Sequence, residues 1–198
     1  MKITGFSAAA CLLTCTACLS APIDSVRKVL DNALWQTTVT KYYDASYVRI
    51  PYPNGDVPVD RGVCTDVIVR AFRAVDIDLQ KLIHEDMKKH FPAYPTTWGL
   101  KKPDANIDHR RVSNIARYLK RTGKEVPPSK NGRDYKPGDI VTWIIPGDLD
   151  HIGLVSSIPV DSTDRFRVIH NIGSGAAVED VLFEFRITGH YRYFSERK

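Results

Sequence analysis

Hydrophobic residues in the first half of the chain recur at helical spacing, and polar segments rich in proline and glycine separate these stripes. Over 23–38, apolar residues follow one another at intervals of three or four, which marks one face of an α-helix, with Asp24 as the expected N-cap. The same spacing predicts three further helices, at 64–77, 79–91 and 111–123. Tyrosine, proline, glycine and aspartate dominate 42–62, so we expect a loop with short extended pieces there.

Short β-prone runs replace the helical pattern in the second half of the chain. These runs lie at 135–147, 151–158, 165–172 and 178–194, and the last of them supplies one or two strands. Helices followed by successive strands predict an α+β domain, in which N-terminal helices pack on one face of a C-terminal antiparallel sheet.

The first 21 residues have the layout of a secretory signal peptide. Lys2 is followed by small and apolar residues, with no further charge before Asp24. We expect cleavage near Ala21, which leaves one mature domain over 22–198 in the periplasm or outside the cell. A lipoprotein anchored through Cys18 is the alternative, because "CTAC" is a weak lipidation site. No apolar run is long enough to predict a transmembrane span.

The charge of the chain is mildly positive and evenly distributed. The formal net charge is +5 at pH 7, and acidic residues stand between the basic ones. A nucleic-acid-binding surface would show a concentrated basic stripe or a known motif, and the sequence contains neither. We therefore expect no nucleic-acid partner.

Removal of the signal peptide changes the meaning of the cysteines. Of the four cysteines, Cys64 is the one that lies outside the first 21 residues. A lone cysteine in an oxidising compartment is an inert buried thiol, an intermolecular partner or a reactive thiol. If a helix begins at Cys64, the helix dipole and the free first-turn amides favour the thiolate and lower the pKa of the thiol. The same amides would also hold an oxyanion.

A thiolate nucleophile needs a base and a group that orients the base. His151 opens one strand candidate and His170 ends the next. If 151–157 and 165–171 pair as a hairpin, the two histidines are neighbours on the sheet. The pair alone is open to a structural, a catalytic or a metal-binding interpretation. A zinc hydrolase would add a carboxylate such as Asp148 or Asp150, although "HEDMKKH" does not have the spacing of a zinc-binding His-Glu-x-x-His helix.

The segment before the fourth predicted helix, 108–111, combines an acid, a histidine and two arginines. It is either a wall that binds carboxylates such as peptide termini, or a capped and solvated helix start. Trp98 and Trp143 are interpreted as core or as the wall of a groove.

The motifs "VCTDVIVRAF", "KPGDIVTW", "HIGLVSS" and "VIHNIG" follow the order of elements in NlpC-type cell-wall peptidases, which the chain resembles. Those enzymes are papain-like, with a cysteine at a helix start and a histidine at a strand start. The stretches "DVPVDRGVCTDV", "WGLKKPDANIDHRRV" and "HNIGSGAAVEDVLFEFRITGHYRY" look typical of the YijF-like family of bacterial exported proteins. This second likeness extends from Val39 to Phe194 and implies a papain-like α+β fold.

The resemblance implies a role for each matching residue. Cys64 would be the nucleophile, His151 the general base and acid, and His170 the residue that orients His151. Asn171 is the alternative third group. Tyr52, in a loop before the cysteine, would help to hold the oxyanion or the substrate.

The chain departs from the peptidases around the nucleophile. The peptidases usually read Asp-Cys-Ser-Gly, whereas Val63, Thr65 and Asp66 surround Cys64 here. We expect Asp66, which adds a charge in the first helical turn, to alter the choice of substrate.

The resemblance implies an exported cysteine peptidase or amidase that cleaves amide bonds in peptidoglycan peptides. The nucleophile and the base suffice for that reaction, so no cofactor and no metal are expected. The alternative is a non-catalytic module that binds cell-wall peptides or a protein partner, which the changed residues around Cys64 favour.

Overall fold

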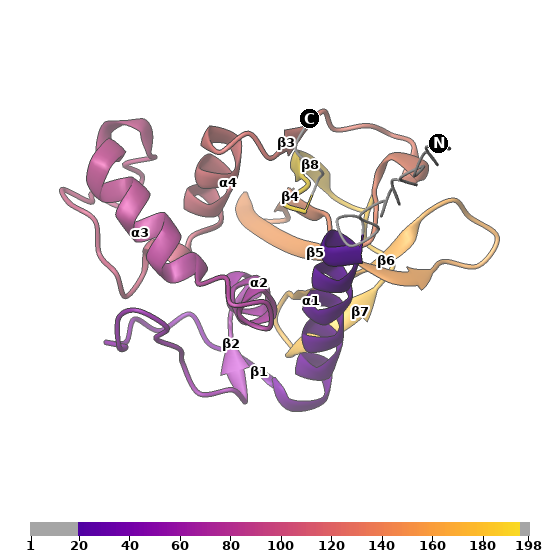
Figure 1. Cartoon of the computed structure of the whole chain (residues 1–198), viewed down its shortest axis with the longest axis horizontal. Coiled ribbons are helices and arrows are strands. Elements are labelled where there is room, and N and C mark those ends of the chain that lie inside the picture. Colours follow the sequence, from indigo (N-terminus) through magenta and orange to yellow (C-terminus); the bar gives the residue numbers. More distant parts are fainter. Residues whose placement is uncertain (1–19, 195–198) are drawn as a thin grey trace, which may run out of the picture.

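The computed structural model describes residues 20–194, in which a helical half precedes a single large sheet (Figure 1). The predicted signal peptide, including Cys18, lies outside the described residues except for its last two positions. Export therefore stays a prediction. No helix in the described range is both long and apolar enough to cross a membrane.

The predicted helical segments are all helical in the structure. The helices are α1 (Ser20–Val39), α2 (Cys64–Arg73), α3 (Leu79–His90) and α4 (Val112–Arg121), with short 3-10 turns η2 (Phe91–Ala93), η3 (Asp108–Arg110) and η4 (Gly132–Asp134). The prediction that Asp24 caps the first helix is wrong. Because α1 begins at Ser20, Asp24 lies inside the helix and forms a 2.6 Å ion pair with Arg27.

The main sheet is antiparallel throughout and has the strand order β3-β8-β4-β5-β6-β7. Its strands are β3 (Glu125–Val126), β4 (Ile140–Ile145), β5 (Leu149–Pro159), β6 (Phe166–Asn171), β7 (Ala176–Glu179) and β8 (Arg186–Tyr191). A second sheet pairs β1 (Tyr42–Tyr43) with β2 (Arg61–Gly62) in parallel, so the two ends of the tyrosine-rich loop meet beside the start of α2. The two-residue strands β1, β2 and β3 are too short for the hydrophobic pattern to reveal.

Alternate residues of the sheet face two separate cores, as the pleat of a strand requires. Ile140, Ile152 and Ile169 pack with the helices, whereas their neighbours Val141 and Val168 belong to a second cluster. Figure 1 shows α1 and α2 lying against the sheet, with α3 farthest from it. This arrangement confirms the predicted α+β class.

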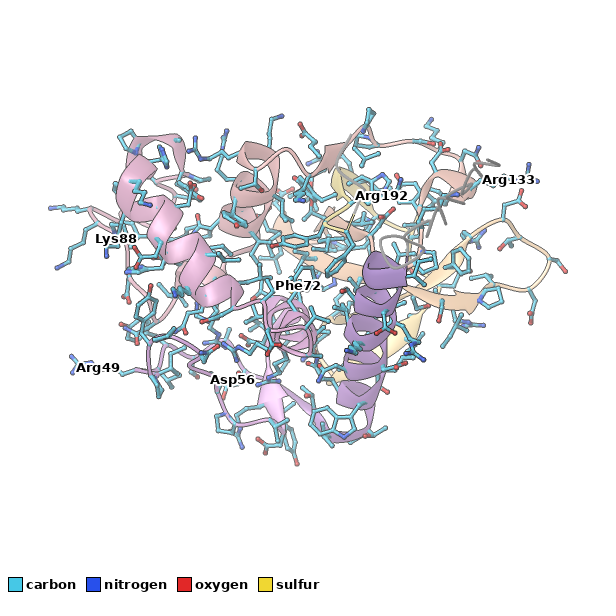
Figure 2. All side chains as sticks on the ribbon, viewed as in Figure 1. Arg49, Asp56, Phe72, Lys88, Arg133 and Arg192 are labelled. Atoms are coloured by element: carbon cyan, nitrogen blue, oxygen red, sulfur yellow. The ribbon has the colours of Figure 1, made fainter. Side chains whose placement is uncertain are left out.

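The centre of the helical core is Phe72 of α2, whose side chain is fully buried. Its ring lies 5.0 Å from that of Tyr193 and 5.4 Å from that of Phe194, so the end of the described chain closes over the helices. Figure 2 shows Phe72 in the middle of the molecule and Lys88 and Arg133 at its periphery. Helix α2, which begins with the cysteine, is thus held rigidly against the sheet.

Candidate active site

Helix α2 begins at Cys64, as predicted, and Asp66 fixes that start. The Asp66 carboxylate accepts the N–H of Val63, the residue before the helix, at 2.7 Å. Gly62 makes room for this carboxylate, because a Cβ at that position would lie 2.8 Å from Asp66 Oδ2 and its φ is +154°. The sequence "GVCTD" is therefore one structural unit that sets the position of the thiol.

The Asp66 carboxylate is also paired with Arg110 in the interior. Arg110 Nε and Nη2 both lie 3.0 Å from the carboxylate oxygens, and the two side chains are almost completely buried. Arg110 further donates to the carbonyl oxygens of Ser46 and Asp44 at 2.9 and 3.0 Å. Asp66, for which the sequence predicts an effect on the choice of substrate, anchors a buried network that joins α2, η3 and the tyrosine-rich loop.

Asn171 has a similar anchoring role. Its amide nitrogen donates to the carbonyl oxygen of Gly62 at 3.1 Å, and its amide oxygen accepts the N–H of Gly173 at 3.3 Å. These contacts turn the side chain away from His151. Within the described residues, the hydrogen bonds of Asn171 go to backbone groups, and the position beside His151 Nε2 is taken by His170.

His151 and His170 are direct neighbours, as the predicted hairpin required. Strands β5 and β6 are antiparallel, and His151 Nε2 lies 2.9 Å from His170 Nδ1. Gly153 is needed between them, because a Cβ there would lie 2.5 Å from Val168 Cγ1 and 3.3 Å from His170 Cβ. Both imidazoles are buried, so the sheet holds the pair still.

Glu179 extends the pair to three residues, and the sequence reasoning missed it. It lies on β7, and its Oε2 is 3.0 Å from His170 Nε2, although out of line for a hydrogen bond. A carboxylate at this nitrogen favours the tautomer with the proton on Nε2, which leaves His170 Nδ1 as the acceptor for His151 Nε2–H. In that tautomer Nδ1 of His151 is the basic nitrogen.

The helix start was expected to lower the pKa of the Cys64 thiol, but burial of the thiol has the opposite and larger effect. Burial raises the pKa of the Cys64 thiol to about 12, with the amide of Ile152 opposing the rise and the Asp66 carboxylate adding to it. The predicted lowering by the helix start is therefore outweighed by desolvation. The Cys64 thiol is therefore neutral at neutral pH.

His151 is neutral as well. Burial, with a smaller contribution from His170, lowers the pKa of His151 to about 3. The pKa of His170 is also lowered by burial, and Glu179 opposes that change. A neutral thiol and a neutral imidazole therefore form the resting state of this site.

The thiol and the imidazole line the same cleft, which has a volume of about 680 Å³. That volume suits a short peptide or another small ligand. No hydrogen bond joins Cys64 to His151 within the described residues. Trp98 lines the cleft and is half-exposed, whereas Trp143 is buried in the second core, so each occupies one of the two expected environments.

Tyr52 is placed away from this cleft. Its hydroxyl donates to Glu85 on α3 at 2.7 Å, and its ring contacts His84 edge to face. The tyrosine that lines the cleft is Tyr43, on β1. Burial raises the pKa of Tyr43, with Cys64 and Asp66 adding to the effect, so its hydroxyl is a hydrogen-bond donor beside the thiol. The tyrosine-rich composition of the loop was the available signal for Tyr43.

The segment 108–111 forms part of the cleft wall and is not a solvated helix start. Asp108, His109 and Arg110 are buried, and both Arg110 and Arg111 line the cleft. Burial lowers the pKa of His109 to about 4, so that histidine is neutral. The interpretation of this segment as a wall therefore fits the structure.

The zinc alternative finds no support in the arrangement of donors. Within residues 20–194, no group of three or more His, Cys, Asp or Glu side chains is placed to hold a metal ion. The nitrogens with which His151 and His170 face each other are occupied by their mutual hydrogen bond.

The sequence matches the family described as "Domain of unknown function (DUF1287)" over residues 30–193. It is 54% identical over 167 residues to "Uncharacterized protein YijF" of Escherichia coli (strain K12), which covers 84% of this chain and 80% of that protein. Among solved structures, an N-acetylmuramoyl-L-alanine amidase from Bacteroides uniformis ATCC 8492 is similar with a TM-score of 0.51. That similarity has 13% identity and covers 85% of this chain and 98% of the amidase.

A second solved structure, NlpC1 from Trichomonas vaginalis, is similar with a TM-score of 0.44 and 15% identity. The match covers 86% of this chain but 44% of that protein, so the chain spans less than half of its length. The amidase match, together with the observed helices and sheet, confirms the predicted fold.

Proposed function

The chain belongs to the DUF1287 family, and we propose that it is an exported cysteine hydrolase that cleaves amide bonds in peptidoglycan peptides. The observation that carries this proposal is the hydrogen-bonded pair of His151 and His170, of which His151 lines the same cleft as the helix-initial Cys64. The fold shared with an N-acetylmuramoyl-L-alanine amidase supports the choice of substrate.

The first step begins from the neutral pair. The Cys64 sulfur attacks the carbonyl carbon of the amide, and its proton passes to Nδ1 of His151 as the S–C bond forms. His151 then gives that proton to the leaving amine, and the C–N bond breaks. The result is a thioester on Cys64 and a free amine.

Water completes the cycle. His151 Nδ1, again neutral, removes a proton from a water molecule that attacks the thioester carbon. The acid product leaves, and the proton returns to the Cys64 sulfur. Nucleophile and base suffice for these steps, so the proposed reaction uses no cofactor.

The oxyanion formed in each step is placed near the start of α2. The first-turn amides beside Cys64 are suitable donors, and the Tyr43 hydroxyl is a second donor that lines the cleft. We assign to Tyr43 the role that the sequence suggested for Tyr52.

Glu179 is proposed as a positioning residue. It acts through His170, because its carboxylate contacts His170 Nε2 and does not line the cleft. It holds the tautomer in which His151 Nδ1 is unprotonated and available to the thiol.

The proposal is tested by incubating the mature protein with purified peptidoglycan fragments and identifying the products by mass. We expect an amide to be hydrolysed by the wild type and left intact by Cys64→Ala at matched folded concentration. Full activity in Cys64→Ala would refute a cysteine mechanism.

A specific observation favours the alternative of a non-catalytic binding module: Cys64 is only 4% exposed. Such a module would bind the fragments with equal affinity as wild type and as Cys64→Ala, and would release no product. Product formation by the wild type would exclude this alternative.

A further inference from the structure

We propose that Arg111 binds a carboxylate of the substrate, so that the cleft selects peptides with a free carboxylate near the scissile amide. The inference rests on the proposed function for its substrate, and it narrows that substrate to an anionic class. It is carried by a contrast between the two arginines that line the cleft.

Each nitrogen of the Arg110 guanidinium already donates to an acceptor within the protein. Its Nε and Nη2 are bound to Asp66, and its Nη1 and Nη2 to backbone carbonyl oxygens of the tyrosine-rich loop. Arg110 is therefore part of the framework of the cleft.

Arg111 has no comparable partner. Within residues 20–194 its side chain makes no ion pair and no hydrogen bond, and its Nη1 is buried without an acceptor. Two acids of the described chain act on its charge without pairing with it: Asp104 binds Asn106 and Tyr47, and Asp108 binds His84 through Oδ2 while its Oδ1 is buried without a partner. A partly buried guanidinium without an anion is unfavourable, and a bound carboxylate would relieve that cost.

The orientation of Arg111 is set by Trp98. The guanidinium carbon lies 4.3 Å from the centre of the Trp98 ring, so the cation stacks on the aromatic face. Stacking uses the face of the guanidinium. Nη1 is buried, whereas Nε and Nη2 are neither buried nor hydrogen-bonded within the described part of the chain, and this edge can recognise a carboxylate through two parallel hydrogen bonds. Burial also lowers the pKa of Arg111, while Asp108 and Asp104 oppose that change from a distance.

The cleft joins this cation to the proposed reacting groups. Arg111 and Trp98 line the same 680 Å³ cavity as Cys64 and His151. A carboxylate on Arg111 would therefore belong to the same peptide as the amide at Cys64, and it would fix the register of that peptide.

The experiment uses one set of soluble peptidoglycan fragments in two forms, native and with the carboxyl groups converted to carboxamides. The wild type is compared with Arg111→Gln, with Arg111→Lys, and with Arg117→Gln as the matched control. Arg117 lies on α4, the helix that Arg111 precedes, is exposed, and does not line the cleft, so its substitution removes the same charge elsewhere. Thermal unfolding checks that each variant is folded. If Arg111→Gln does not fold, Arg111→Lys serves as the test variant in its place.

We expect the wild type to prefer the native fragments in kcat/KM by about 10- to 100-fold, the effect of a charged hydrogen bond. Arg111→Gln should lose this preference, Arg111→Lys should keep only part of it, and Arg117→Gln should keep all of it. An unchanged preference in Arg111→Gln would overturn the inference and leave the proposed hydrolase intact.

Binding separates this inference from the proposed function. In the Cys64→Ala background, calorimetry should show tighter binding of native than of amidated fragments, and Arg111→Gln should abolish the difference. This result supports the carboxylate site even if no fragment is ever hydrolysed. Equal affinity for the two forms, or no binding of either, contradicts it.

Discussion

Two buried histidine sites on the same sheet differ in the residues that bind the histidine and in whether the histidine lines the cleft. On β8, His190 Nε2 is 2.7 Å from Asp139, and Arg192 donates to both oxygens of the same carboxylate at 2.8 and 2.6 Å. The ring of His190 is stacked on Tyr135 with a centroid distance of 4.2 Å. Within the described residues, this first cluster contains the ion pair of Arg192 and Asp139, leaves His190 Nδ1 buried without a partner, and does not line the cleft.

In the second site His151 is hydrogen-bonded to His170, and the carboxylate of Glu179 contacts His170 rather than His151. Burial alone would raise the pKa of Asp139, but the hydrogen bonds from His190 and Arg192 hold it below its usual range. Within residues 20–194, His151 forms no ion pair. Its pKa is lowered to about 3 by burial and by His170. The histidine beside a carboxylate and an arginine lies away from the cleft, whereas the neutral His151 lines it and can meet a ligand there.

The largest expected effect is the loss of activity when the second site is disrupted at His151. His151→Gln should lower kcat/KM on peptidoglycan fragments by about 10³-fold, because the thiol loses its base. His190→Gln is the matched control and should retain activity within about twofold per folded molecule, since His190 does not touch the cleft. Equal losses in the two variants would remove the distinction between the sites.

The next effect breaks the first site. Asp139→Asn should lower the free energy of unfolding by about 3–5 kcal/mol, because Arg192 loses its counter-ion and His190 loses its carboxylate hydrogen-bond partner. Urea unfolding of the wild type, of Asp139→Asn and of Glu179→Gln measures this. A loss in Glu179→Gln as large as that in Asp139→Asn would show that both clusters are structural.

Acid provides a test of the neutral state of His151. Its folded pKa of about 3 lies below the ordinary 6.5, so between these values the unfolded chain binds the proton more readily. The folded state therefore keeps its full stability above pH 6.5 and loses stability as the pH falls towards 3. The loss that His151 causes is about 2 kcal/mol at pH 5. Urea unfolding at pH 7 and pH 5 should show a smaller acid loss in His151→Gln than in the wild type. An identical loss would mean that His151 is not held neutral.

The smallest effect sharpens the role of Glu179. Glu179→Gln should lower kcat/KM by about tenfold, as expected for loss of one tautomer-fixing contact. The Glu179 carboxylate supports protonation of His170, so its removal should move the acid limb of the kcat/KM profile to lower pH. Glu179→Asp should restore part of the rate. A lower rate with an unshifted pH profile would leave Glu179 with a purely structural role.

Most of the fold was predictable from the sequence because the hydrophobic periods are long and regular. The helix that begins at Cys64 and the hairpin that joins His151 to His170 follow from local pattern alone. Both fall within segments where spacing and turn residues agree.

The unpredicted parts of the site depend on contacts between distant segments. Glu179 looks like an ordinary solvent-facing residue of a strand, and only the register of β7 against β6 brings it to His170. Tyr43 rather than Tyr52 reaches the cleft because β1 pairs with β2. The raised pKa of Cys64 likewise depends on burial, which a helix-start argument does not contain.

The Arg110 network bears on the order in which the cleft is built. Arg110 is separated along the chain by 44 residues from Asp66, by 64 from Ser46 and by 66 from Asp44. Contacts of such long range form late in folding, because the loops between them must close first. Secondary structure can therefore be complete before the cleft exists. In native-state hydrogen exchange, the amides at the start of α2 and in η3 should open and close together, as one cooperative unit.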